Sequence, residues 1–251
     1  MSAVDSREML ARMAGVAQLR ASQRADPLHA ARVTQVRSFQ VRRFEHTYAD
    51  LLHDPRHGAA ARFFLEELYA ARSFDERDAQ FSRVIPAVGR VFPQEVVHTV
   101  VRLTELLALS ESLDDRMAHQ LTGDGHGALS AAGYAAAWRA TGEALQRQRQ
   151  IALTLDIGAD LDRYTRSRAI GMTLKLMRRP ARAAGLAALQ QFLETGFEAF
   201  ARIGGAEGFL RQVEARETAL AAALFAAPFA APFAADAAPG ATPAWAGLLP
   251  A

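Results

Sequence analysis

Apolar residues recur at intervals of three and four from about residue 6 to residue 226, and this spacing limits the fold more than any other feature of the sequence. Met9, Met13 and Val16 follow it near the beginning of the chain, and Phe209 and Val213 follow it near the end. Because a helix turns by about 100° per residue, residues spaced in this way share one helix face. No stretch alternates apolar and polar residues as a half-buried strand would. The sequence therefore predicts an all-α protein.

Proline and glycine divide this pattern into about eight or nine helices. Pro27 and Pro55 each follow an aspartate and interrupt the apolar spacing. A further break is expected near Gly158, and Pro180 is expected to end the helix that follows. Long helices bury their apolar faces most simply by packing side by side. We therefore expect residues 1–226 to form a single bundle-like domain of antiparallel helices.

Residues 227–251 differ in composition from the rest of the chain. They consist mostly of Ala, Pro, Phe and Gly, and Asp236 is their only charged residue. Proline breaks helices, and small side chains bury little apolar area. The sequence predicts a disordered, low-complexity tail, whose removal from Pro228 to Ala251 should leave the melting temperature nearly unchanged.

Composition excludes several classes of protein. The chain has no cysteine, so it can form neither disulfides nor thiolate metal sites. Its 29 basic and 27 acidic residues leave a net charge of only +2. The first residues lack the apolar run of a secretory signal. The longest apolar stretch, residues 218–235, is interrupted by Pro228 and Pro232, which argues against a membrane span. We therefore expect a cytoplasmic protein.

The segment Phe63–Tyr69, with the sequence Phe-Phe-Leu-Glu-Glu-Leu-Tyr, is the densest cluster of aromatic and acidic residues in the chain. As part of a helix over residues 58–71, it places Phe64 and Leu68 at the centre of one face. Glu66 then points toward solvent, whereas Glu67 lies at the edge of the aromatic face. A carboxylate in that position needs a hydrogen-bonded or cationic partner, because a lone buried charge is costly.

Three arginines that follow this segment are candidate partners for Glu67, namely Arg72, Arg77 and Arg83. An ion pair of Glu67 with one of them would lock the helix of the segment to the next helix. The alternative is that Glu67 is a metal ligand or a general base. The residues expected to form the structural lock are Phe63, Phe64, Glu67, Leu68 and Arg77.

The segment Phe63–Tyr69 also resembles the signature of an uncharacterised bacterial family, the FFLEELY motif proteins. The resemblance covers most of residues 45–226. It extends to Phe74–Phe81, Leu113–Met117, Met177–Ala181 and Gly204–Leu210. The family has no established activity, so the resemblance implies no catalytic residues.

Glu95 and His98 form a Glu-x-x-His pair, a pattern that ferritin-like di-iron proteins use twice in one site. Here the motif occurs once. Asp115 and His119 resemble a second pair, but His119 is about 31 Å from His98 along the same helix. His98, flanked by valines, is also the best candidate for a haem ligand. We expect no cofactor, and the alternative is an iron- or haem-dependent oxidoreductase with a site around Glu67, Glu95 and His98.

Seven cations lie between Arg163 and Arg182, and three of them, Arg168, Lys175 and Arg179, share one side of the expected helix. This face favours docking of an anionic partner, although a solvated surface has the same pattern. Nucleic acid is disfavoured because Tyr164 is the only aromatic residue available for stacking. We therefore expect a non-enzymatic interaction or regulatory protein that binds a protein or another anionic partner, and self-association stays open.

Overall fold

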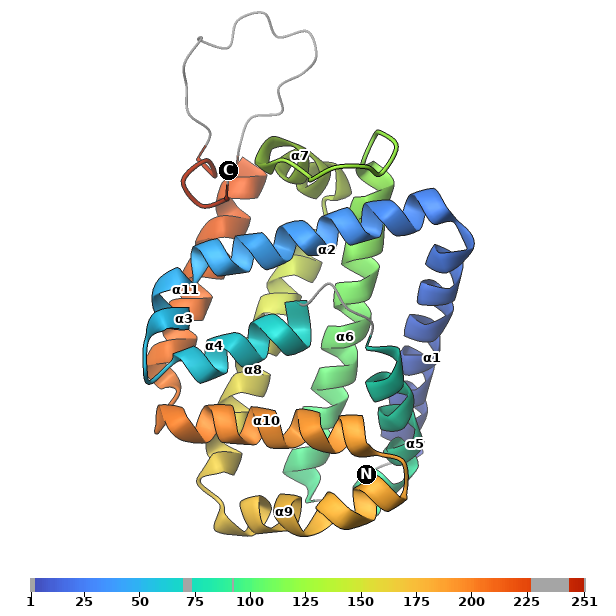
Figure 1. The fold of residues 1–251 in the computed structure, drawn as a ribbon, viewed down its shortest axis with the longest axis vertical. Helices are drawn as coiled ribbons and strands as arrows, with labels where there is room; N and C mark the ends of the chain where they lie inside the picture. Colours follow the sequence, from blue (N-terminus) through green and yellow to red (C-terminus); the bar gives the residue numbers. More distant parts are fainter. Residues whose placement is uncertain (1–2, 70–73, 92, 227–243, 251) are drawn as a thin grey trace, which may run out of the picture.

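Helices form all the regular secondary structure in the part of the chain that the computed structural model describes, residues 3–69, 74–91, 93–226 and 244–250 (Figure 1). This confirms the predicted all-α class. The helices are α1 (Ala3–Ala25), α2 (Pro27–Thr47), α3 (Ala49–His53), α4 (Gly58–Phe64), α5 (Asp75–Val91), α6 (Gln94–Gln120), α7 (Ala131–Thr141), α8 (Ala144–Thr165), α9 (Arg168–Ala183), α10 (Ala187–Ile203) and α11 (Glu207–Ala226).

Four long helices, α1, α6, α8 and α11, lie side by side in that order and form one layer. A second group, α2, α4 and α10, crosses this layer, with α2 packed on α6 and α10 packed on α8 (Figure 1). Within this layer α8 runs antiparallel to α6 and α11, whereas α1 runs parallel to α6, since Arg12 contacts Glu105 and Gln23 contacts Asp115. The long antiparallel packing expected from the sequence therefore describes only part of the first layer. The chain leaves that layer at Pro27, because the Asp26 side chain accepts hydrogen bonds from the N–H groups of Leu28 and His29 and starts α2 in a new direction.

Two helix breaks were placed wrongly by the sequence reasoning. Gly158 lies inside α8, where a Cβ atom would come within 2.6 Å of Leu210 on α11. The glycine therefore permits close packing of α8 on α11. The chain breaks instead at Ser167, whose side chain caps α9 by accepting from the N–H of Ile170. Pro180 does not end α9, which continues to Ala183.

The segment Phe63–Tyr69 is not one regular α-helix. The α-helical part ends at Phe64, and Leu65–Tyr69 forms a π-helical turn, η1. A π turn closes over five residues and changes the phase of the side chains that follow. The end of the helix expected over residues 58–71 lies outside the described residues, and so does the side chain of Leu68.

Part of the expected tail packs on the protein. Leu249 is 3% exposed and belongs to the core cluster that includes Phe39, Trp138 and Leu224, with Trp245 packed against it. The prediction of a separate tail is therefore wrong for residues 244–250, where two large apolar side chains offset the low complexity of the sequence. Residues 227–243 lie outside the described part of the chain.

None of the described helices combines the length and the apolar character that crossing a membrane requires.

Candidate functional site

The two phenylalanines of the motif segment are buried against α10 and the beginning of α11. The Phe63 ring lies 5.5 Å from the Phe192 ring, and the Phe64 ring lies 5.9 Å from Phe200 and 6.0 Å from Phe209, measured between centroids. Phe63 also occupies the space above Gly196, where an added Cβ would come within 2.8 Å of its ring. These aromatic contacts hold α4 against α10.

Glu67 contacts one of the three arginines that the sequence offered. Arg77 Nη1 donates to the Glu67 carboxylate at 3.3 Å and to the Glu67 carbonyl oxygen at 3.0 Å. Both side chains are mostly buried, at 16% exposure for Glu67 and 13% for Arg77. Arg83 instead donates to the carbonyl of Gly185, and Arg72 lies outside the described residues. Glu66 is exposed, as the helix phase predicted.

The Glu67–Arg77 pair is the end of a longer chain of buried charges. Arg77 pairs with Asp78 at 2.9 Å, and Asp78 pairs with Arg20 of α1 at 2.9 Å. Arg20 then donates to Glu111 of α6 at 2.7 Å, and Glu111 accepts from Arg37 of α2 at 2.5 Å. Burial opposes the charge of Arg20, but Glu111 and Asp78 raise its pKa above the ordinary value. This network joins η1, α5, α1, α6 and α2 through their charged side chains.

A cavity of about 160 Å³ lies beside this network. Glu111 and Asp114 contribute to its polar wall, and burial raises the pKa of Asp114 despite the nearby Arg37. The rest of the lining is largely apolar and includes Phe81, Leu106 and Phe192.

Trp138 borders this cavity and carries a buried hydrogen-bond donor. Trp138 is buried, lines the cavity, and its indole Nε1 has no hydrogen-bond partner. The guanidinium of Arg147 lies 3.9 Å from the centroid of the Trp138 ring, and one of its N–H groups points to the sulfur of Met117 at 2.9 Å, a weak acceptor. The N–H itself is closed off from the open space, so a bound acceptor would reach it only after the ring turns.

Glu67, Glu95 and His98 are not brought together. Glu95 and His98 are both exposed in the first turns of α6. His98 Nε2 makes a hydrogen bond with Gln94 Nε2 of the same helix at 3.2 Å. His98 therefore lacks the apolar pocket that a haem ligand needs. The described residues contain one group of three side chains close enough to share a metal ion, and it includes neither Glu95 nor His98.

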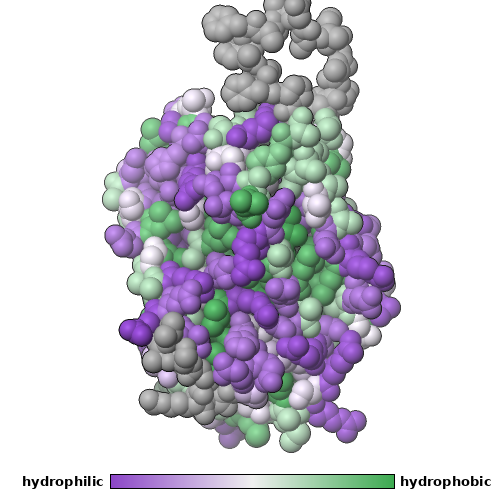
Figure 2. Space-filling view, turned by 180° about the vertical axis from the view of Figure 1, so that it is seen from behind, coloured by the Kyte–Doolittle hydropathy of each residue, from purple (hydrophilic) through white to green (hydrophobic). Residues whose placement is uncertain are grey.

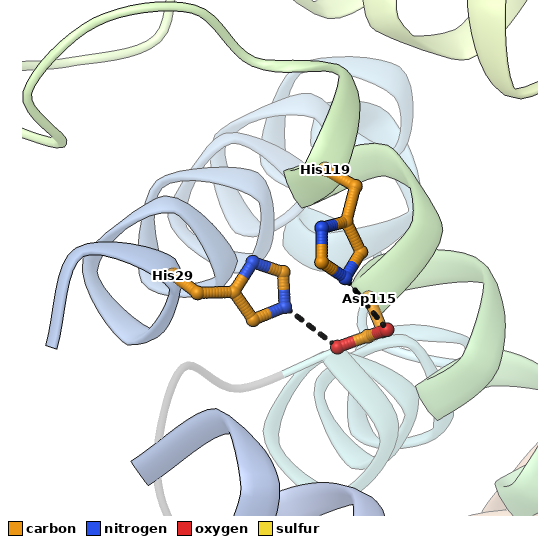
Figure 3. Close-up of side chains that lie close together, drawn as sticks. All are labelled: His29, Asp115 and His119. Carbon is orange, nitrogen blue, oxygen red and sulfur yellow. Dashed lines mark hydrogen bonds and ion pairs between the residues drawn. The ribbon is translucent and has the colours of Figure 1, made fainter. Parts of the chain in front are cut away.

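That group consists of His29, Asp115 and His119 (Figure 3). Asp115 and His119 resemble a ligand pair along one helix in the sequence, and nothing in their spacing connects them with His29. His29 is 86 residues away from Asp115 in the sequence, and only the crossing of α2 over α6 brings the two together. No spacing rule along a single helix could have identified this contact.

The outer face of α9, defined here as Arg168, Met172, Lys175, Leu176 and Arg179, is exposed throughout. The three cations lie on one side of the helix, as the sequence predicted. The sequence reasoning missed the two apolar residues beside them, Met172 at 63% exposure and Leu176 at 74%. In Figure 2, which shows the molecule from behind, apolar patches reach the surface among polar ones, and some lie at the end of the molecule where Figure 1 places α9.

The comparison with known families gives a match over most of the chain. The model of the family described as Domain of unknown function (DUF8198) matches residues 19–230. The chain therefore belongs to this family. No curated protein and no solved structure matches the chain.

Proposed function

We propose that this member of the DUF8198 family is a non-enzymatic interaction protein that docks an acidic protein partner on the outer face of α9. The observation that carries the proposal is the combination, on one helix face, of three exposed cations with two exposed apolar side chains. Exposed apolar residues that stand beside charged ones are typical of protein-binding surfaces.

The charges of this face are available to a partner. Arg168, Lys175 and Arg179 have no ion pair with any described residue, whereas Arg178 of the same helix donates to Glu194 of α10 at 2.7 Å. Arg166, just before α9, also has a carboxylate partner, Asp162. The protein thus neutralises the cations that face its own helices and leaves those of the outer face to interact with external carboxylates.

The apolar residues of the face favour a protein as the partner. Met172 and Leu176 can contact apolar side chains, and methionine adapts well to different partner surfaces. Nucleic acid is favoured less because α9 contains no aromatic residue on which a base could stack. The expected partner is therefore an amphipathic segment with carboxylates along one side and leucine-like residues beside them.

Fluorescence anisotropy with a labelled amphipathic Glu/Leu helical peptide tests this proposal. We expect Lys175→Glu/Arg179→Glu to weaken binding at least tenfold and 0.3 M salt to weaken binding to the unaltered protein. Arg202→Glu/Arg211→Glu is the matched control, because it changes net charge equally at exposed positions outside α9. Equal weakening by both double variants would refute the proposal, and so would tighter binding to a poly(U) strand or to phosphatidylserine vesicles.

A second candidate function is the binding of a small acceptor-bearing molecule in the central cavity. The specific observation in its favour is the unpartnered Nε1 of Trp138, because a buried donor without a partner is costly and rare. A cavity of about 150 Å³ with apolar walls is large enough for benzene. A small aromatic carboxylate would fit this space, and the ring of Trp138 would turn its N–H toward the bound acceptor.

The chain has only two tryptophans, which makes this second function simple to test. On addition of millimolar benzoate, the indole N–H resonance of Trp138 should shift while that of Trp245 stays in place. Trp138→Phe assigns the two resonances. Unchanged resonances, or an equal shift of both, would exclude binding of this ligand class in the cavity.

A further inference from the structure

We propose that His29, Asp115 and His119 form a binding site for a first-row divalent transition metal such as Zn²⁺. His29 lies in the first turn of α2, and Asp115 and His119 lie one turn apart on α6 (Figure 3). One oxygen of the carboxylate is 2.7 Å from His29 Nε2, and the other is 3.6 Å from His119 Nε2. The ligand atoms of all three residues lie within 4.8 Å of one another.

The distances between these ligand atoms are close to those of an occupied metal site, so little movement is needed to bind an ion. At metal–ligand distances of 2.0–2.2 Å, neighbouring ligands of a tetrahedral zinc are about 3.4 Å apart. The observed range from 2.7 Å to at most 4.8 Å includes this value. His119 is 63% exposed, so its ring can move by the required amount without disturbing the core.

The chemistry of the three ligands selects the class of metal. Two imidazoles and one carboxylate suit zinc, cobalt, nickel and copper. Calcium and magnesium require oxygen ligands, and only the carboxylate of Asp115 offers them here. The site would leave at least one coordination position to water, because three protein side chains do not complete a tetrahedron.

The surroundings of the site hold two of the ligands in place. Gln23 of α1 donates to the Asp115 carboxylate at 3.0 Å, which fixes its orientation as hydrogen-bonded neighbours commonly do for metal ligands. His29 is buried, and its backbone N–H is capped by Asp26. The rings of His29 and His119 stack with their centroids 4.0 Å apart, so both imidazoles already lie at the carboxylate.

The position of the site means that a bound metal would link two separate parts of the fold. His29 follows the turn between α1 and α2, and Asp115 and His119 lie near the end of α6. A metal ion held by all three would fasten this turn to α6 and stabilise the folded state by mass action. The expectation of no cofactor rested on the single Glu-x-x-His pair and on the distance of His119 from His98, whereas this site combines His119 with His29 of another helix.

Isothermal titration of the chelator-treated, tag-free protein with ZnCl₂ tests the proposal. We expect one ion per chain, a rise in melting temperature with added Zn²⁺, and no response to Ca²⁺ or Mg²⁺. His119→Ala and Asp115→Asn should each weaken Zn²⁺ binding at least tenfold and abolish the rise in melting temperature. His119 is exposed, so its replacement should leave the helical circular dichroism unchanged.

The matched control is His126→Ala, because His126 is an exposed histidine in the loop that follows α6. It should bind Zn²⁺ as the unaltered protein does. Co²⁺ substitution gives a second readout, since visible d–d bands should appear in the unaltered protein and disappear in His119→Ala. The proposal is overturned if Zn²⁺ does not bind below millimolar concentration, or if His119→Ala and His126→Ala bind it equally.

Discussion

Replacing Glu67 by alanine removes one carboxylate from the end of the buried network, and the structure sets the size of the effect. Breaking a buried pair so that a charge is left alone costs about 3–5 kcal/mol. Arg77 is not left alone, because it keeps Asp78 at 2.9 Å and the carbonyl of residue 67 at 3.0 Å. The loss should therefore be that of one hydrogen bond between charged groups, about 1.5–2 kcal/mol.

Urea unfolding followed by circular dichroism measures this loss, with two variants as references. Glu67→Gln should lose less than Glu67→Ala, since the amide oxygen can still accept from Arg77. Glu66→Gln changes an exposed side chain one residue earlier and should stay within about 0.5 kcal/mol of the unaltered protein. The structural lock would be refuted by equal unfolding midpoints for Glu67→Ala and Glu66→Gln. A loss above about 4 kcal/mol would show instead that Asp78 does not compensate Arg77.

Three further results are expected. Leu249→Ala should lower the free energy of unfolding in urea by about 2–3 kcal/mol, because Leu249 is 3% exposed in the core. An unchanged free energy of unfolding would show that residues 244–250 do not pack on the core. Gly196→Ala should cost about 1–3 kcal/mol, since its Cβ would meet the Phe63 ring at 2.8 Å, and full stability would show that α4 can move away. Burial raises the pKa of Asp114 above its ordinary value of 3.8, so the folded state holds this proton more tightly than the unfolded state and loses stability as the pH rises above that value. The stability of Asp114→Asn relative to the unaltered protein should therefore increase between pH 4 and pH 7, and a decrease would contradict this reasoning.

The helical content and the orientation of the motif segment could be predicted because they depend on local spacing. The phase of the helix placed Glu66 outward and Glu67 at the edge of the aromatic face, although a π turn follows Phe64. Arg77 was one of three candidate partners, and the structure shows the contact of Glu67 with it. The break expected at Gly158 was wrong because it also relied on local sequence alone. Glycine disfavours helix locally, but here the close contact of α8 with Leu210 on another helix requires it.

The features that depend on contacts between distant segments could not be predicted. His29 meets Asp115 only because α2 crosses α6, and Arg20 enters the buried network from 91 residues before Glu111. Leu249 reaches the core from beyond a stretch of Ala and Pro that gives no helical signal. The outer face of α9 could be predicted only in part. Its cations were evident from their spacing, but the exposure of Met172 and Leu176 was not.

Amide hydrogen exchange with and without the amphipathic Glu/Leu peptide tests the central claim most directly. If the peptide docks on the outer face of α9, protection should increase in Arg168–Ala183 and stay unchanged in α2 and α11, which lie elsewhere on the molecule. The protection should disappear in Lys175→Glu/Arg179→Glu. Protection centred on any other helix, or unaltered protection of α9 in that variant, would contradict the claim that this face is the docking surface.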